Sequence, residues 1–378
     1  MKKVSLQPRE NWGERMMELG FSFHSGDENY WIEGNPIEFT EKQIIDIEKA
    51  TNDVHSMSLE LVEDIICKGD YQHYNLLTSQ KQEIERSWKE KDFYLYGRFD
   101  LSLNQSGVPK FLEYNADTPT TLLEGALVQQ DWQETINHGG NYFNVIHEAL
   151  IDRWKLWTSR FPNELLHLTT FENYEEDWGT LLYIEKTAKL AGIKTKAVDL
   201  EKLVFDSSLN AYLDSDEKVI RHLFKIYPWE WIFENSFSMG MFETIKMVEP
   251  AWKLLLSNKS MWPLLWKKYP GHPNLLASFF DYQSMEKVST NYVSKPTLSR
   301  EGNNVTIFNN SNIELLSGGA YGDAPLIYQD RCDATLIDNE YYNIGSWVVG
   351  DKAVGIGLRK ENDLIVRNIS HYVPHYYK

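Results

Sequence analysis

In this 378-residue sequence, the residues best placed to carry out chemistry are four polar residues near the ends of two apolar segments. The first segment contains Arg98 and Asp100, and the second contains Glu113 and Asn115. Residues two apart in a strand point to the same side, so each pair would share one face. If the two segments pair as strands, the four side chains can act on a common ligand.

A hairpin is predicted between residues 94–103 and 108–115, because the turn formers Asn-Gln-Ser-Gly connect them. If the turn is centred between the serine and the glycine, Asp100 lies opposite Glu113, and the other two polar residues also face each other. All four side chains then project into one space.

Two carboxylates that face each other on a sheet repel each other, and a divalent cation would offset this repulsion. Mg²⁺ prefers oxygen ligands and usually takes one or two carboxylates together with substrate phosphates. Asp100, Glu113 and Asn115 are therefore candidate magnesium ligands, and Arg98 is a candidate for stabilising a phosphoryl group in transfer. Judged from the hairpin alone, a solvated, salt-bridged surface is the competing interpretation.

Phosphate binding would have to use residues outside the common glycine-rich motifs, because the sequence has neither a Walker motif nor a dinucleotide-binding fingerprint. Lys259 and Lys295 are candidate phosphate ligands, although each alone could equally be a surface lysine. Together with Arg300, Lys295 belongs to a segment of roughly 285–325 that is predicted to be a lid over a triphosphate. Gln329 ends an apolar strand and could hydrogen-bond to an adenine edge.

Several helices are predicted around these residues. A long helix should begin near Thr40, which has capping-box spacing with Gln43. Apolar residues recur on one face of this helix at Ile44, Ile47, Val54, Leu61 and Ile65. Further helical segments are predicted at 122–136, at 143–157 and from about 239 to 266.

A βαβ unit is predicted within residues 165–225, with a helix that Gly192 ends between two apolar strands. It implies a small parallel sheet covered by helices. Glu176 and Asp177 stand at the start of this helix. They are candidate substrate-side acids, and they are equally natural charges for a helix N-terminus.

The composition excludes several classes of protein. Two cysteines cannot form a disulfide framework, and no apolar run reaches the ~18 residues that span a bilayer. With no apolar stretch at its start, the chain is predicted to be cytoplasmic with no membrane partner. The net charge of −17 disfavours nucleic acid as a partner and is compatible with a cationic substrate such as a polyamine.

Taken together, these segments resemble the synthetase domain of the glutathionylspermidine synthase family, particularly its short bacterial members that lack an amidase half. The resemblance covers nearly the whole chain, which we treat as one domain over residues 1–378. It rests on separate blocks in one order: 12–21, 95–100, 112–120, 227–231, 249–252, 258–274, 295–302 and 344–350.

The resemblance implies a mixed α/β fold of the ATP-grasp type, in the permuted arrangement of glutathione synthetase, with the βαβ unit as a preATP-grasp-like subdomain. The order of the motifs fits this arrangement, because the carboxylate pair precedes the lid lysines. The implied activity is an ATP-dependent carbon–nitrogen ligase. ATP phosphorylates a carboxylate, and an amine then displaces phosphate to give an amide.

The matching motifs also imply roles for individual residues. Asp100, Glu113 and Asn115 resemble ligands of Mg²⁺, two ions being expected, and Arg98 resembles the residue that steadies the acyl phosphate. The nucleotide contacts would be Lys259, Lys295, Arg300 and Gln329, and the contacts to the acid would be Thr118 and Arg359. The partners would be a small carboxylate and a peptide-like or polyamine-like amine. Trp231 departs from the run found in the bifunctional enzymes, so both substrates stay unassigned.

Two other functions compete with this one. The chain could be an ATP-binding protein of the same fold without ligase turnover. It could also be a carbohydrate-binding or hydrolytic module that uses Asp100 and Glu113 as acid and base at a separation of ~5 to 10 Å. The second alternative gives Lys259, Lys295 and Arg300 no function.

Overall fold

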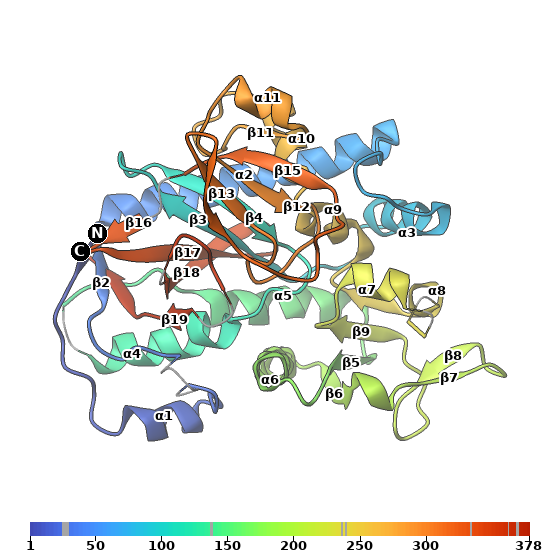
Figure 1. Cartoon of the computed structure of the whole chain (residues 1–378). Coiled ribbons are helices and arrows are strands. Elements are labelled where there is room, and N and C mark those ends of the chain that lie inside the picture. The colour runs from blue at the N-terminus through green and yellow to red at the C-terminus, as the bar shows by residue number, and fades with distance from the viewer. Residues whose placement is uncertain are drawn as a thin grey trace.

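The computed structural model describes residues 1–24, 30–136, 139–235, 237–238, 240–332, 335–361, 363–367 and 370–378. Within these residues the fold has three larger sheets with helices packed around them, and both chain ends lie on the same side of the molecule (Figure 1). In this described part, no helix combines the length and the apolar character that crossing a membrane requires.

A six-stranded antiparallel sheet occupies the centre of the fold. Its order is β19-β18-β17-β3-β4, and β16 also pairs with β17. Segments far apart in the chain meet here, because β17 pairs with β3 from Ile344 to Val349. The strands are β3 (Tyr96–Leu103), β4 (Pro109–Asn115), β16 (Thr335–Ile337), β17 (Glu340–Val349), β18 (Lys352–Glu361) and β19 (His371–Tyr372).

The long helix α2 (Glu41–Lys68) covers one face of this sheet. It begins as predicted, with Thr40 and Gln43 forming a reciprocal capping box. The predicted apolar face is confirmed, since all of its members are buried: Ile44, Ile47, Val54, Leu61 and Ile65.

Alternate residues of β17 separate the two faces of the central sheet. Ile344 and Val348 belong to the same core as α2, and Ser346 hydrogen-bonds to a threonine of that helix at 2.8 Å. Trp347 points the other way into a second core, and the Arg98 guanidinium lies over its ring at 5.7 Å. The face turned away from α2 therefore carries the polar side chains of the hairpin.

A second, five-stranded antiparallel sheet has the order β11-β15-β12-β13-β14. It approaches the central sheet at β4, where Lys295 Nζ of β12 donates to the Leu112 carbonyl oxygen at 3.1 Å. The predicted lid, 285–325, contains three of its strands. The elements are β11 (Ser278–Phe279), α11 (Tyr282–Glu286), β12 (Tyr292–Pro296), β13 (Thr306–Asn309), β14 (Asn312–Leu316) and β15 (Leu326–Asp330).

The third sheet is parallel, has the order β10-β9-β5-β6 and lies at the lower right in Figure 1. The predicted βαβ unit is confirmed, because β5 and β6 are parallel and α6 connects them. Gly192 follows the end of this helix with a positive φ of 85°, as expected of a helix terminator. The elements are β5 (Leu165–Thr170), α6 (Glu175–Leu190), β6 (Lys194–Asp199), β9 (His222–Lys225) and β10 (Lys246–Val248).

The remaining elements are short or peripheral. A small sheet ties the chain ends together through β1 (Lys2–Lys3), β2 (Ile37–Phe39) and β20 (His375–Tyr377), and a separate hairpin joins β7 (Val204–Asp206) to β8 (Ala211–Leu213). The other α-helices are α1 (Trp12–Glu18), α3 (Thr78–Lys89), α4 (Gln129–Thr135), α5 (Ile146–Arg160), α7 (Trp229–Glu234), α8 (Met241–Thr244), α9 (Leu254–Ser257) and α10 (Met261–Lys268).

The predicted continuous helix from about 239 to 266 is wrong. Its start, Met239, lies outside the described residues, and the rest is divided among α8, β10, a 3-10 turn at Ala251–Lys253, α9 and α10. The apolar run that suggested a helix joins the edge of the parallel sheet as β10, and Pro250 precedes the 3-10 turn. Tertiary pairing here overrides local helical preference.

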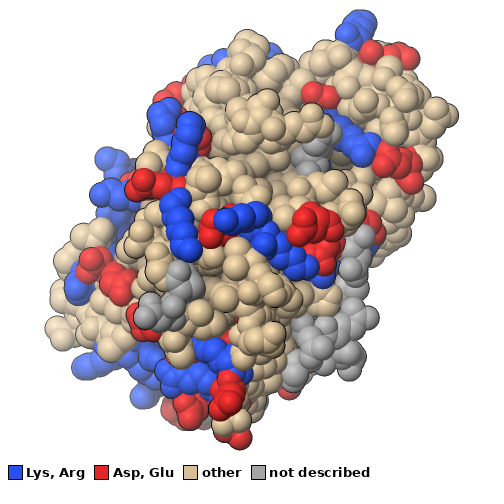
Figure 2. All heavy atoms as spheres, turned by 90° about the vertical axis from the view of Figure 1, so that its left-hand side faces the viewer, with Lys and Arg blue, Asp and Glu red and all other residues tan. Residues whose placement is uncertain are grey.

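Charged side chains of both signs lie next to one another on the face shown in Figure 2. Among the ion pairs of the described residues, Glu340 contacts Lys3 at 2.7 Å and Lys360 at 2.8 Å.

Candidate active site

A cavity of about 510 Å³ opens between the central sheet, the second sheet and the start of α6. All predicted site residues except Glu176 line it: Arg98, Asp100, Glu113, Asn115, Thr118, Asp177, Lys259, Lys295, Arg300, Gln329 and Arg359. Residues that the sequence separates by more than 250 positions thus share one space.

The hairpin forms, and Asp100 pairs with Glu113 as predicted. Arg98 and Asn115 also pair as predicted. Nearer the turn, the pairing of the two strands is shifted by one residue, because a β-bulge next to Asp100 inserts one extra residue between the two registers. The prediction is confirmed at the polar end of the hairpin, although the turn is centred slightly earlier than assumed.

Asp100 holds two guanidinium groups at the cavity wall. Arg98 donates from Nε to Asp100 Oδ1 at 2.8 Å, and Arg359 donates from Nη2 to Asp100 Oδ2 at 2.8 Å. Arg98 Nη1 also donates to the Thr120 carbonyl oxygen at 2.7 Å and to Thr121 Oγ1 at 2.8 Å. Both arginines are thereby fixed in orientation, which suits them to stabilise negative charge on a ligand.

Space for the Arg98 side chain depends on the residue across the strand pair. Gly345 of β17 pairs with Asp100, and a Cβ at this position would lie 2.9 Å from Arg98 Cδ. Only glycine therefore lets the arginine lie flat along the sheet.

Glu113 is surrounded by cationic and amide groups. Lys259 Nζ lies 3.3 Å from Glu113 Oε2, and Asn115 Nδ2 donates to Glu113 Oε1 at 3.2 Å. Burial alone would raise the pKa of Glu113, but the positive charges of Lys259 and Lys295 lower it to about 2. Glu113 is therefore ionised throughout the physiological range.

Lys295 and Gln329 are neighbours on adjacent strands β12 and β15. Lys295 Nζ donates to Gln329 Oε1 at 2.8 Å, and burial lowers the pKa of Lys295 to about 8. Within the described part of the chain, the buried Gln329 Nε2 has no hydrogen-bond partner. It is a donor available to a ligand in the cavity.

Arg300 connects the segment after β12 to two other parts of the cavity wall. Its Nη1 donates to Thr118 Oγ1 at 3.1 Å, its Nη2 pairs with Glu230 of α7, and its guanidinium lies over the Trp231 ring at 5.6 Å. Sequence reasoning did not assign Glu230, whose only signal was its place in the block 227–231. Lys259 Nζ also donates to the Ser299 carbonyl oxygen of this segment at 2.7 Å.

An acidic group, which we define as Glu124, Glu176 and Asp177, lies at the start of α6 and beside it. Asp177 lines the cavity, and burial together with the charge of Glu176 raises its pKa to about 7. Glu124 is fully buried and accepts a hydrogen bond from Tyr30 OH at 2.8 Å. Burial and the charge of Glu176 raise the pKa of Glu124 to about 8.

Glu124 and Glu361 were missed at the sequence level. Glu124 lies in a π-helical turn, Glu124–Val128, which no periodicity in the sequence reveals. Glu361 could have been found, because it follows Arg359 by two residues in β18 and therefore shares its face. It lines the cavity, and burial raises its pKa to about 7.

The predicted magnesium ligands fit a hard cation in their chemistry. Asp100 and Glu113 offer carboxylate oxygens on facing strands, and Asn115 offers an amide oxygen beside them. Among the described residues, no three or more His, Cys, Asp and Glu side chains form a cluster that could hold a metal ion. A site with so few protein carboxylates suits Mg²⁺, which takes the rest of its ligands from substrate and water.

Comparison with known proteins identifies the family. Residues 3–378 match the family described as glutathionylspermidine synthase preATP-grasp. The chain belongs to this family. Its relatives include a putative acid–amine ligase of Haemophilus influenzae, 38% identical over 392 residues that cover both chains in full.

Two longer relatives are matched in part. A trypanothione synthetase of Crithidia fasciculata is 28% identical over 75% of this chain and 47% of its own length. A bifunctional glutathionylspermidine synthetase/amidase of Escherichia coli is 24% identical over 89% of this chain and 58% of its own. The relatives are ligases and synthetases, so the predicted class of enzyme, a carbon–nitrogen ligase, is confirmed.

The fold has a solved counterpart. A glutathione synthetase-like effector from Globodera pallida aligns with a TM-score of 0.62 at 12% identity, over 99% of this chain and 98% of that one. This likeness confirms the predicted mixed α/β, glutathione synthetase-like fold.

Proposed function

We propose that this family member is an ATP- and Mg-dependent ligase that activates a carboxylate as an acyl phosphate and joins it to an amine. The observation that carries this proposal is one cavity in which two facing carboxylates, Asp100 and Glu113, meet two lysines from other elements, Lys259 and Lys295. A carbohydrate hydrolase has no role for the two lysines, whereas an enzyme that binds a nucleoside triphosphate uses lysines to hold the phosphates.

On the phosphate side, Lys259 and Lys295 would bind the phosphates of ATP, and Gln329 would donate its free N–H to the nucleotide. Asp100, Glu113 and Asn115 would hold Mg²⁺, with two ions as the expectation. Bound there, the metal would neutralise charge between carboxylates and phosphates and polarise the transferring phosphoryl group. Burial lowers the pKa of Lys295. The negative charge of a nearby phosphate would raise it again and keep the lysine in its charged form.

The acid substrate would bind beside Arg98 and Arg359, with Thr118 nearby. Its carboxylate oxygen displaces ADP from the terminal phosphorus of ATP, and the amine nitrogen then attacks the carbonyl carbon. The bond from that carbon to the phosphate oxygen breaks, phosphate leaves, and the nitrogen loses a proton. The two arginines, held by Asp100, counter the negative charge in both steps, and no side-chain nucleophile is needed.

The amine would bind toward the acidic group Glu124, Glu176 and Asp177. A cationic amine enters this group favourably, because it supplies the positive charge that these buried carboxyls lack. Asp177, with a pKa of about 7, is suited to take up the proton that the attacking amine releases. We further propose residues 285–325 as the lid and 165–225 as the substrate-side subdomain.

The test is ADP formation by the purified protein with panels of acids and amines, with mass spectrometry of the product. We expect sustained ADP formation only when acid, amine, ATP and Mg²⁺ are all present, together with a product mass equal to acid plus amine minus water. Without the amine, ADP formation should stop at about one equivalent per enzyme, because the acyl phosphate is not consumed. ATP binding without ADP formation across the panels would favour the ATP-binding protein without turnover.

A further inference from the structure

Strand β3 extends beyond the strand that pairs with it on one side. β4 ends at Asn115, which pairs with Arg98, whereas β3 begins at Tyr96 and pairs there only with Val349 of β17 in the sheet as described. The first backbone groups of β3 on the β4 side therefore have no strand partner. Buried backbone polar groups without partners are costly, so the fold must satisfy them otherwise.

Glu249 and Lys253 take the place of the missing strand. Glu249 Oε1 accepts hydrogen bonds from the backbone N–H groups of Leu95 at 2.9 Å and of Tyr96 at 3.0 Å. Lys253 Nζ donates to the Tyr96 carbonyl oxygen at 2.6 Å and lies 2.7 Å from Glu249 Oε2. Exposure of the two residues is 0% and 1%, so these contacts form away from water.

The contacts at Tyr96 continue to Arg98 through a shared aromatic ring. The Tyr96 ring stacks on Trp347 with centroids 6.1 Å apart and an angle of 6° between planes. The Arg98 guanidinium lies over the same Trp347 ring at 5.7 Å. Tyr96 OH also donates to the Pro119 carbonyl oxygen at 3.1 Å, beside Thr120, whose carbonyl oxygen accepts from Arg98.

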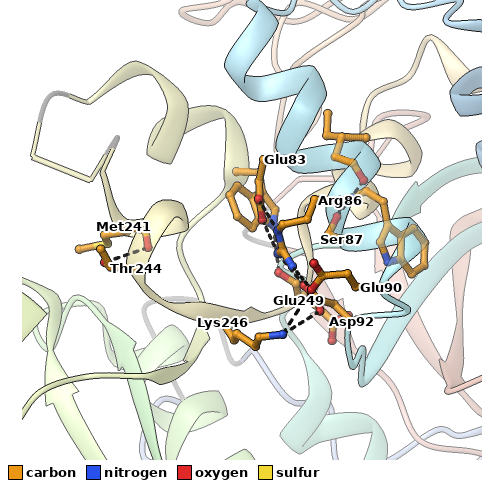
Figure 3. A network of polar contacts seen from close by, with 12 residues as sticks. Glu83, Arg86, Ser87, Glu90, Asp92, Met241, Thr244, Lys246 and Glu249 are labelled. Carbon is orange, nitrogen blue, oxygen red and sulfur yellow. Dashed lines mark hydrogen bonds and ion pairs between the residues drawn. The ribbon is translucent and has the colours of Figure 1, made fainter. Parts of the chain in front are cut away.

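A layer of ion pairs next to Glu249 reinforces this junction (Figure 3). Arg86 of α3 pairs with Glu83, Glu90 and Asp92, each at 2.7 Å, and Lys246 of β10 lies 3.4 Å from Glu90. These ion pairs connect α3 to β10, the two elements next to the buried pair of Glu249 and Lys253. None of these residues lines the cavity, so any effect on a ligand is indirect.

We propose that Glu249 and Lys253 are positioning residues for the ligase reaction, which set the location of Arg98 by holding the first residues of β3. This inference rests on the proposed function for its catalytic meaning. Arg98 acts on charge that develops during transfer, so its displacement lowers kcat more than it raises KM.

The variants Lys253→Met, Glu249→Leu and Glu249→Gln test this proposal. The first two remove the partners of the Tyr96 carbonyl oxygen and of the two N–H groups while keeping a similar volume. We expect kcat per folded molecule to fall about 10²-fold, as for a misplacement of about 1 Å, with KM values within about threefold of the unmodified protein. Glu249→Gln keeps an oxygen acceptor and should retain at least about ten times more activity than Glu249→Leu.

Asp214→Asn is the matched control. Asp214 is likewise buried, accepts from two backbone N–H groups, of Asp216 and Lys218, and binds a lysine, Lys196. Although Asp214 belongs to the segment 165–225, it does not line the cavity, so its variant should lose stability while kcat per folded molecule is unchanged.

Hydrogen exchange of the Leu95 and Tyr96 amides gives a readout independent of turnover. Faster exchange in Lys253→Met than in Asp214→Asn supports the positioning role even if no acid and amine pair yields ADP, a result that would defeat the proposed function alone. The inference is overturned if exchange at these amides is unchanged, or if Lys253→Met and Glu249→Leu keep the kcat of the Asp214→Asn control.

Discussion

The two sides of the cavity carry opposite charge, and burial affects them differently. On the basic side Glu113 stands among lysines, and its pKa is lowered to about 2. On the acidic side the pKa of Asp177 is raised to about 7 and that of Glu124 to about 8. Glu124 is fully buried, whereas Glu113 and Asp177 are both half-buried, so the extent of burial does not explain why the pKa of Glu113 falls and that of Asp177 rises.

What separates the two sides is the balance of charges from the protein itself. Two lysines dominate at Glu113, whereas the arginines that act on the acidic group are outweighed by burial and by neighbouring carboxylate charge. Glu113 has Lys259 at 3.3 Å, whereas the largest electrostatic influence on Asp177 and on Glu124 is another carboxylate, Glu176. The basic side is therefore preorganised for ATP and metal, while the acidic side gains charge neutralisation only when a cationic ligand arrives. This asymmetry matches one anionic and one cationic substrate.

Among variants that test this difference between the two sides, Glu113→Ala should have the largest effect. We expect kcat to fall by about 10³-fold or more, because the variant removes a metal ligand and leaves Lys259 without its anion. ADP formation measures this. The exposed Glu243→Gln is the control and should retain full activity. ADP production at the native rate by Glu113→Ala would show that the metal assignment is wrong.

Removing one cation from the basic side should have the next largest effect. In Lys295→Met the KM for ATP is expected to rise about 10- to 100-fold, the loss typical of a charged hydrogen bond. Steady-state ADP formation at varied ATP gives the value, and the exposed Lys287→Met of the same segment is the matched control. Equal KM values for the two variants would remove Lys295 from the nucleotide site.

The basic side could be predicted from the sequence because its signals are local. The period of a strand and the turn formers between two segments bring Asp100 opposite Glu113 without any knowledge of the rest of the fold. Even there, the β-bulge was not predictable. The predicted pairing of Asp100 with Glu113 is correct because the bulge shifts the register by one residue, which cancels the error in the assumed centre of the turn. For Lys259 and Lys295, family resemblance rather than periodicity carried the assignment.

Only part of the acidic side could be predicted. Glu176 and Asp177 were expected from their place at the start of the helix in the βαβ unit, whereas Glu124 was not. Glu124 lies on a π-helical turn, and its proximity to Glu176 depends on the packing of α6 against the central part of the fold. The predicted helix from about 239 to 266 failed for a related reason, because β10 is a strand only through pairing with β9. Contacts between distant segments leave no periodic trace in the sequence.

The acidic side should make stability depend on pH. Unfolded carboxyls ionise near pH 4, whereas Asp177 ionises near 7 and Glu124 near 8 in the folded protein. Between these values the folded state binds more protons than the unfolded state, so these groups lower the free energy of unfolding as the pH rises from about 4 to 8.

Glu124→Gln isolates this effect. The variant should be more stable than the unmodified protein at pH 8.5 by about 4 kcal/mol relative to the same comparison at pH 5, because about three pH units separate pH 5 from the pKa of Glu124 and each contributes about 1.4 kcal/mol. Urea unfolding at the two pH values measures it, and Glu243→Gln should leave the pH dependence unchanged. If Glu124→Gln follows the unmodified protein at both pH values, the carboxyl is not titrating in this range.

A change on the opposite face of the central sheet should affect stability alone and by the smallest amount. Thr40→Ala removes the side chain that accepts a hydrogen bond from Gln43 at the start of α2, which costs about 1 kcal/mol. Because α2 packs on the face of the sheet away from the cavity, kcat and the KM values for ATP, the acid and the amine should stay the same. Urea unfolding together with ADP formation tests this. A fall in kcat for Thr40→Ala would mean that the two faces are coupled, and losses in the cavity variants could then no longer be assigned to charge alone.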